Sequence, residues 1–129
     1  MGLIILLVRC VPADKSSVIQ GTWKMDSLYT YYNGFGLTKY DFEEQPLRHY
    51  QANGKLMMTR GEESRLFSYK VQNNDSLIHF NLNEKILDQF LIISLDQDQL
   101  ILKKNVLPVF PGNNQERYEV RYFSKVKSN

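Results

Sequence analysis

The chain has 129 residues, of which 43% are hydrophobic and 12% aromatic, so one domain can build a packed core without metals or disulfides. Its 16 basic and 14 acidic residues are mixed along the chain and leave a net charge of +2. A nucleic-acid-binding protein would carry a basic stripe on one face, so nucleic acid is not expected as a partner. The single cysteine, Cys10, precedes the predicted domain, which excludes an internal disulfide.

Residues 1–18 are interpreted as a leader. The apolar run at residues 3–8 is too short to span a bilayer, and no Lys or Arg precedes it. Leu7-Val8-Arg9-Cys10 has the Leu and the Cys of a bacterial lipobox, with Arg9 in place of a small residue, and a polar tether up to residue 17 follows. This order predicts a lipoprotein of the outer membrane or periplasm, anchored in the membrane through a lipid on Cys10. The alternative is a frayed N-terminus or a wrongly chosen start codon, and the protein is cytoplasmic if the leader is not a signal.

Residues 19–127 show no sustained helical period and have turn signals at roughly ten-residue spacing, which predicts an all-β domain. Asn53-Gly54 is the strongest hairpin signal, and a glycine-rich turn at residues 33–36 ends the first strand. Residues 37–45 are polar and acidic and are predicted to form a loop, as is the stretch 105–117. The predicted strands are residues 22–32, 47–51, 55–60, 65–72, 76–82, 86–95, 99–104 and 118–126. Eight antiparallel strands in up-and-down order close into a small barrel, which side chains fill or which holds one small ligand.

Gly21-Thr22-Trp23, at the start of the first of these strands, resembles the lipocalin Gly-x-Trp motif. Together with the hairpins at residues 50–56 and 95–102 and the closing strand, it makes residues 19–127 similar to the lipocalin-like domains of bacterial lipoproteins. The resemblance implies a barrel end closed by Trp23, with Arg121 packed on the indole and Lys125 as the alternative. It also implies that the barrel opens toward a ligand at the far end of the first strand.

Aromatic and methionine side chains are the candidate ligand-binding residues. Alternation from Trp23 through Met25 and Ser27 places Tyr29 and Tyr31 on the face of the indole, at the open end. The further candidates on later strands are Met57, Met58, Phe67 and Tyr69. Such side chains offer flat or adaptable apolar area to a small hydrophobic ligand. The alternative is that all of them fill the interior of a small barrel.

No nucleophile, base and orienting group can be assembled from this sequence, so no enzyme activity and no cofactor are predicted. The sequence has neither a Gly-x-Ser-x-Gly motif nor a P-loop. His49 and His79 are the only histidines, and two of them do not complete a typical zinc site, so no metal is predicted. The acidic residues Asp41, Glu43 and Glu44 are interpreted as a solvated loop.

Two functions fit this description. The first is a lipid-anchored, lipocalin-like barrel that binds a small apolar or amphipathic ligand in the cell envelope. The second is an envelope interaction module with a filled barrel, whose loops at residues 34–45 and 105–117 contact an unidentified protein. A cavity of a few hundred Å³ on the order of known ligand pockets, open at one end, would favour the first, and a filled interior would favour the second.

Overall fold

The computed structural model describes residues 2, 14–40, 45–106 and 116–127, and this part of the chain is nearly all β. It contains one helical turn, α1, at Lys15–Val18. The strands are β1 (Gly21–Tyr32), β2 (Phe35–Tyr40), β3 (Leu47–Tyr50), β4 (Lys55–Arg60), β5 (Glu63–Gln72), β6 (Ser76–Phe80), β7 (Ile86–Leu95), β8 (Gln99–Asn105) and β9 (Arg117–Lys125).

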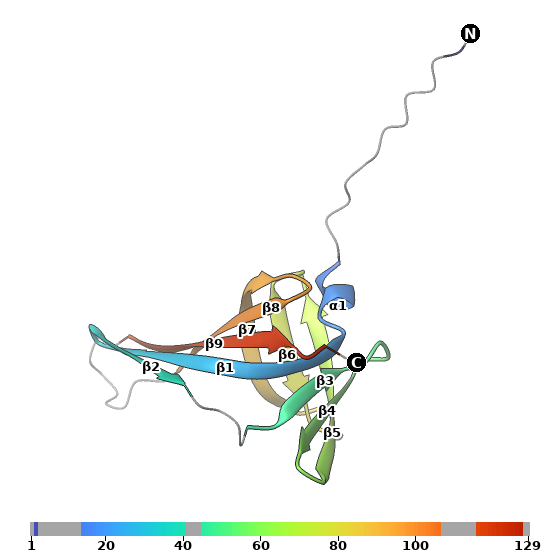
Figure 1. Cartoon of the computed structure of the whole chain (residues 1–129), viewed down its shortest axis with the longest axis horizontal. Helices are drawn as coiled ribbons and strands as arrows, with labels where there is room; N and C mark the ends of the chain where they lie inside the picture. Colours follow the sequence, from blue (N-terminus) through green and yellow to red (C-terminus); the bar gives the residue numbers. More distant parts are fainter. Residues whose placement is uncertain (1, 3–13, 41–44, 107–115, 128–129) are drawn as a thin grey trace.

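Eight of the strands close into an antiparallel barrel (Figure 1). Neighbours follow the order β1, β3, β4, β5, β6, β7, β8, β9, and β9 pairs back onto β1. β2 stands outside this ring, because it pairs with the second half of β1 while β3 pairs with the first half. The architecture is a small up-and-down barrel of lipocalin-like form with one added strand, which confirms the predicted fold.

β2 corrects the prediction of a loop at residues 37–45, since six residues from Phe35 to Tyr40 form a strand. Asn33 and Gly34 have φ values of 50° and 95°, the left-handed conformation of a tight hairpin turn, and they fold β2 back onto β1. Every residue of β2 is exposed. Hydrogen bonds to β1, and not the burial of side chains, therefore keep this strand in position. Its sequence shows no alternation of hydrophobic residues from which a strand could be predicted.

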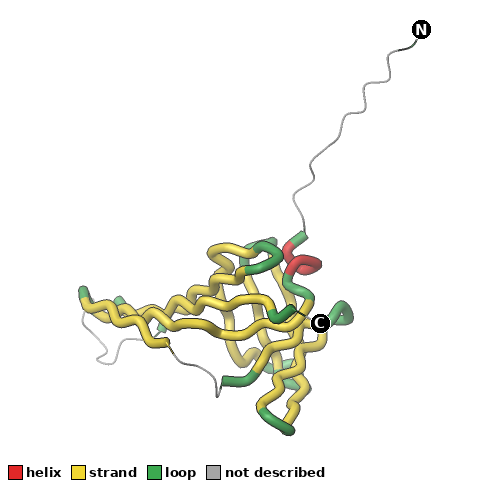
Figure 2. Tube along the Cα trace, in the orientation of Figure 1, coloured by secondary structure: helices red, strands yellow, loops and turns green. Residues whose placement is uncertain are grey.

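We call the two ends of the barrel the closed end and the open end. Because neighbouring strands run in opposite directions, successive turns lie at opposite ends. The start of β1, the turn at residues 73–75 and the turn at residues 96–98 lie at the closed end, next to α1 (Figure 2). The β1–β2, β4–β5 and β6–β7 turns lie at the opposite, open end. There the β4–β5 hairpin and the group formed by β1, β2 and β9 splay apart as two arms (Figure 1).

Apolar side chains fill the closed half of the barrel, because the buried residues of each strand lie toward its closed end. Trp23, Tyr50, Leu56, Leu77 and Phe123 are at most 1% exposed. The remaining buried members of this core are Ile19, Met25, Tyr69, Phe90, Ile92, Leu100 and Leu102. Met58 and Phe67 pack against the core from the open side.

α1 covers the closed end. Its N-cap, Asp14, accepts a hydrogen bond from the backbone N–H of Ser16 at 3.1 Å, and the N–H of Lys15 donates to Asn74 Oδ1 of the β5–β6 turn at 3.0 Å. Ile19 follows the helix and is fully buried. The polar stretch predicted to be a tether up to residue 17 therefore includes a helical turn packed on the barrel.

Candidate ligand-binding site

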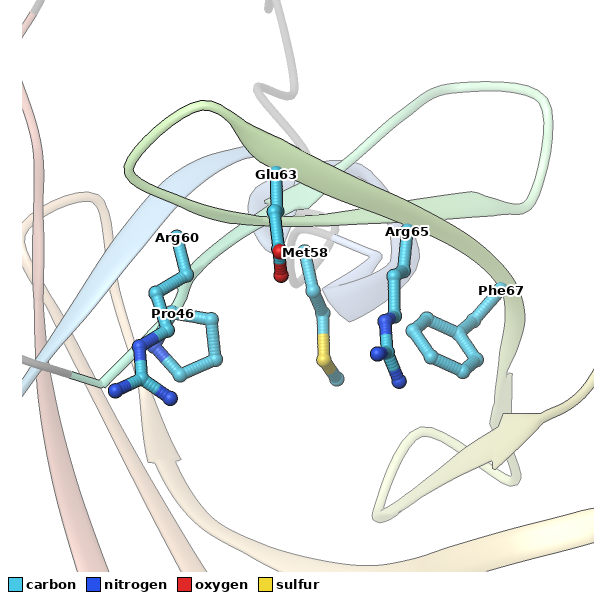
Figure 3. A pocket seen from close by; sticks show the side chains of 6 residues that line it. All are labelled: Pro46, Met58, Arg60, Glu63, Arg65 and Phe67. Atoms are coloured by element: carbon cyan, nitrogen blue, oxygen red, sulfur yellow. The ribbon is translucent and has the colours of Figure 1, made fainter.

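A cavity of about 300 Å³ lies against the inner face of the β4–β5 hairpin, at the open end of the barrel (Figure 3). Met58 and Phe67 form its apolar wall and reach from the hairpin to the core. The register pairs Met58 with Arg65 and Arg60 with Glu63, so charged side chains on the same face continue toward the turn. The lining residues are Pro46, Met58, Arg60, Glu63, Arg65 and Phe67. An apolar wall beside a charged rim suits an amphipathic molecule.

The register decides which of two adjacent methionines faces the interior. Met58 packs on the core, as does its neighbour Leu56 two positions earlier. Met57 lies opposite His49 and Leu66, on the outer face of the barrel. Of the two adjacent methionines among the interior candidates, Met58 therefore faces the cavity and Met57 does not, because a strand alternates its side chains residue by residue.

Phe67 and Tyr69 both face inward, at different depths. Phe67 lines the cavity. Tyr69 is 8% exposed and belongs to the closed half, where its ring meets Tyr50 edge-on at 4.9 Å between centroids and its hydroxyl donates to the carbonyl of Gln51. Of these two candidates, Phe67 can contact a molecule in the cavity, while Tyr69 is a core residue.

A β-bulge in β1 overturns the expected position of Tyr29 and Tyr31. Met25 lies opposite Phe123 and both are buried, but the next paired residue of β1 is Ser27, opposite Tyr122. The extra residue, Asp26, shifts the alternation by one position. Beyond the bulge, the residues that share the face of Trp23 are therefore even-numbered.

Tyr29 and Tyr31 consequently lie on the outer face of the β1–β9 arm. Their rings pack against Tyr118, with centroid distances of 6.4 and 4.8 Å, and the Tyr31 pair is stacked. The ammonium of Lys103 lies 4.4 Å from the Tyr118 ring centroid. This cluster is separate from the cavity, so neither tyrosine lines the interior as the sequence had predicted.

Arg48 of β3 is paired with a residue that lines the cavity and reaches toward the core. It is opposite Met58 on β4, and its guanidinium reaches across the barrel to the rings of Phe123 and Phe90, at 4.8 and 5.9 Å from their centroids. The side chain is half-buried. Its Nη1 atom is buried without a hydrogen-bond partner among the described residues.

Charged and polar side chains surround the ring of Phe90 and form a layer across the barrel, which we call the polar layer. Arg121 and Lys104 also approach its ring, at 5.2 and 5.8 Å from the centroid. Two carboxylates accompany these cations, since Asp88 pairs with Lys104 and Glu119 pairs with Arg121 at 3.1 Å. Each pair is partly exposed and is worth at most about 1 kcal/mol.

His79 and Tyr50 form a buried hydrogen bond in the same layer, with 2.9 Å between Tyr50 Oη and His79 Nε2. Burial, assisted by the charge of Arg48, lowers the pKa of His79 to about 3, so the imidazole is neutral at neutral pH. Burial raises the pKa of Tyr50, and the charge and hydrogen bond of Arg48 oppose that shift. Tyr50 can donate its proton to Nε2 or accept one from it, according to the tautomer of His79. The other ring nitrogen of His79, Nδ1, has no hydrogen-bond partner among the described residues.

Sequence reasoning missed this layer, although one signal was present. Alternation along β6 puts His79 on the face of the fully buried Leu77, as it puts Arg48 on the face of Tyr50 along β3. A charged or imidazole side chain on a strand is more often solvated than buried, and only contacts across the barrel distinguish the two cases.

The closed end carries the Gly-x-Trp segment, with Lys125 in the position expected for Arg121. Trp23 is fully buried, its Nε1 donates to the carbonyl of Ile19 at 2.7 Å, and Lys125 Nζ lies 5.4 Å from the ring centroid. Gly21 has a φ of 127°, and a Cβ there would stand 2.6 Å from Lys125 Cε. The strand register explains why Lys125, and not Arg121, packs on the indole, because Lys125 is opposite Trp23 whereas Arg121 is opposite Leu28.

The remaining candidates do not assemble into a site in the described residues. His49 is exposed on the outer face while His79 is buried inside, and no three His, Cys, Asp or Glu side chains of the described part are grouped to hold a metal. No helix in that part is long and apolar enough to cross a membrane. Cys10 and the acidic residues Asp41, Glu43 and Glu44 lie outside the described residues.

In comparisons with known proteins, no family model matches this sequence, and none of the curated proteins matches it.

Proposed function

We propose that this protein is a lipid-anchored, lipocalin-like carrier that binds a small apolar or amphipathic molecule in the open half of its barrel, in the cell envelope. The observation that carries the proposal is the cavity of about 300 Å³ on the inner face of the β4–β5 hairpin, a volume at the lower end of small-molecule pockets. Met58 and Phe67 would bury the apolar part of the ligand, which gains about 25 cal/mol per Å². The charged residues toward the turn would stay beside its polar part.

A neutral apolar fluorescent probe, N-phenyl-1-naphthylamine, tests the carrier function. It should bind with one site per chain and an affinity on the order of micromolar. Met58→Trp should fill the cavity and weaken binding at least about tenfold. Met57→Trp is the matched control, because the same change on the adjacent, outward position should leave the affinity within about twofold. Absence of binding to a folded, monodisperse sample, or equal effects of the two variants, would refute this assignment of the site.

The rival function, a protein-interaction module, has its own supporting observations. The closed half is filled by side chains, and β2 exposes Phe35, Leu37 and Tyr40 by 81, 73 and 69%. Apolar side chains on an exposed edge strand are suited to a protein partner. This function becomes the preferred one if the probe does not bind.

The anchor is supported by the order of an apolar run, Cys10 and a polar stretch. In the native host, the protein should fractionate with membranes, and mass spectrometry should find a mature chain that begins at a lipid-modified Cys10. Cys10→Ser should stay soluble or unprocessed. A soluble protein that retains Met1 would contradict the anchor and leave the ligand site unaffected.

A further inference from the structure

The polar layer around Phe90 carries an excess of positive charge. Three cations lie against this ring, those of Arg48, Lys104 and Arg121. Two of them have a carboxylate partner, Asp88 or Glu119. No carboxylate of the described residues pairs with Arg48, so this guanidinium is the unbalanced charge of the layer.

An ionic group removed from water is costly unless it is paired. The rings of Phe123 and Phe90 offset part of the cost for Arg48, but its buried Nη1 still lacks an acceptor among the described residues. Arg121 adds a second unused donor, because its buried Nε has no partner among the described residues. Nδ1 of the buried His79, whose ring lies 5.3 Å from Phe90, also has no partner among them. Unused donors beside an unpaired cation are what an anion would satisfy.

We propose that Arg48 binds the anionic head group of the ligand, so that the natural ligand is a single-chain amphiphile ending in an oxyanion. The inference rests on the proposed carrier function. Arg48 is directly opposite Met58, which lines the cavity, so a head group at the guanidinium leaves the chain to extend along Met58 and Phe67 toward the open end. A guanidinium suits a carboxylate or a sulfate because its planar donors bind two oxygens at once.

Three ten-carbon compounds test the charge preference: decanoate, decyl sulfate and 1-decanol, each displacing N-phenyl-1-naphthylamine from the full chain. Decanoate, decyl sulfate or both should bind at least about tenfold more tightly than decanol, and the comparison between the two identifies the preferred oxyanion. Arg48→Gln should abolish this preference and leave the affinity for decanol within about twofold. Lys70→Gln removes the same charge from an exposed residue on the outer face of β5 and should keep the preference.

The outcomes separate the two proposals. If neither the probe nor any ten-carbon compound binds, the carrier function fails and the head-group site fails with it. If decanol binds as tightly as both anions, or if Arg48→Gln keeps the preference, the carrier function stands and the role of Arg48 is refuted.

A measurement on the unaltered protein covers the case in which Arg48→Gln does not fold. The carboxyl carbon of ¹³C-labelled decanoate reports its ionisation by NMR. A guanidinium partner lowers the pKa of the bound carboxyl below that of the free acid, whereas burial in apolar surroundings raises it. A lowered pKa supports the site, and an unchanged or raised pKa overturns it.

Discussion

His79 shows how burial determines the chemistry of a single residue. It lies on the inner face of β6, its Nε2 bonds the Tyr50 hydroxyl, and its pKa is about 3 in place of the ordinary 6.5. A histidine of this kind is no proton donor near neutrality. In the folded protein His79 is a neutral polar group, and at mildly acidic pH it binds a proton only when the chain unfolds.

This shift predicts that acid weakens the fold. Below pH 6.5 His79 of the unfolded chain binds a proton, whereas His79 of the folded protein stays neutral until the pH approaches its pKa of about 3. The free energy of unfolding should therefore fall between these values, by up to about 1.4 kcal/mol per pH unit from this residue. Urea unfolding at pH 7, 6 and 5 measures the slope, and His79→Gln should flatten it. Identical slopes for the two proteins would show that other groups carry the acid sensitivity.

β1 shows that one extra residue can redirect a whole strand. The bulge at Asp26 sends Trp23 and Met25 inward but Tyr29 and Tyr31 outward, and the same strand then serves the core at one end and an aromatic outer face at the other. Residues that line the flared arm on the inside are therefore Leu28 and Thr30, opposite Arg121 and Glu119.

The bulge predicts that the tyrosines of β1 do not contribute to ligand binding. Tyr29→Ala and Tyr31→Ala should leave the affinity for N-phenyl-1-naphthylamine within about twofold, and Tyr31→Ala should cost about 0.5–1.5 kcal/mol of stability beyond its lost area through the stack on Tyr118. Phe67→Ala, on the cavity wall, is the comparison and should weaken binding. A larger loss of affinity for either tyrosine variant than for Phe67→Ala would place the site on the outer face.

The whole molecule divides into a filled half that provides stability and an open half that contains the cavity. The fully buried residues lie toward α1, while the arms at the other end expose apolar residues of β2 and the charged residues of the β4–β5 hairpin. Such a division lets the open half vary or move without loss of the core.

Substitution of two phenylalanines, one in each half, tests this division. Phe123 is 1% exposed in the closed half and Phe35 is 81% exposed on β2. Phe123→Ala should cost about 3–5 kcal/mol through lost burial and a cavity, whereas Phe35→Ala should stay within about 0.5 kcal/mol. Denaturant unfolding followed by circular dichroism gives both values. Similar losses for the two variants would mean that β2 is covered and contributes to the core.

The sequence alone was sufficient for the eight strands of the barrel and for the barrel class, but not for β2, because the turns and the alternation that mark the eight strands are short-range features. Asn53-Gly54 turns the chain between β3 and β4, and its glycine has a φ of 78°. Asp96 closes the β7–β8 turn by accepting hydrogen bonds from the N–H groups of Asp98 and Gln99 at 2.8 and 2.7 Å. Strand β4 begins and ends at the predicted residues, and the Gly-x-Trp segment does open the first strand.

Only the tertiary structure decided which side chains face the interior and meet there. A strand alternates with period two, so the single extra residue at Asp26 and the choice between Met57 and Met58 each exchange inside for outside. Neither can be read from local sequence, because register is set by the partner strand. The layer of Arg48, His79 and Phe90 comes from three strands that are brought together when β9 closes on β1. A guanidinium without a carboxylate partner in the described part of the chain can be recognised there, because closure of the barrel determines which of its carboxylates are within reach.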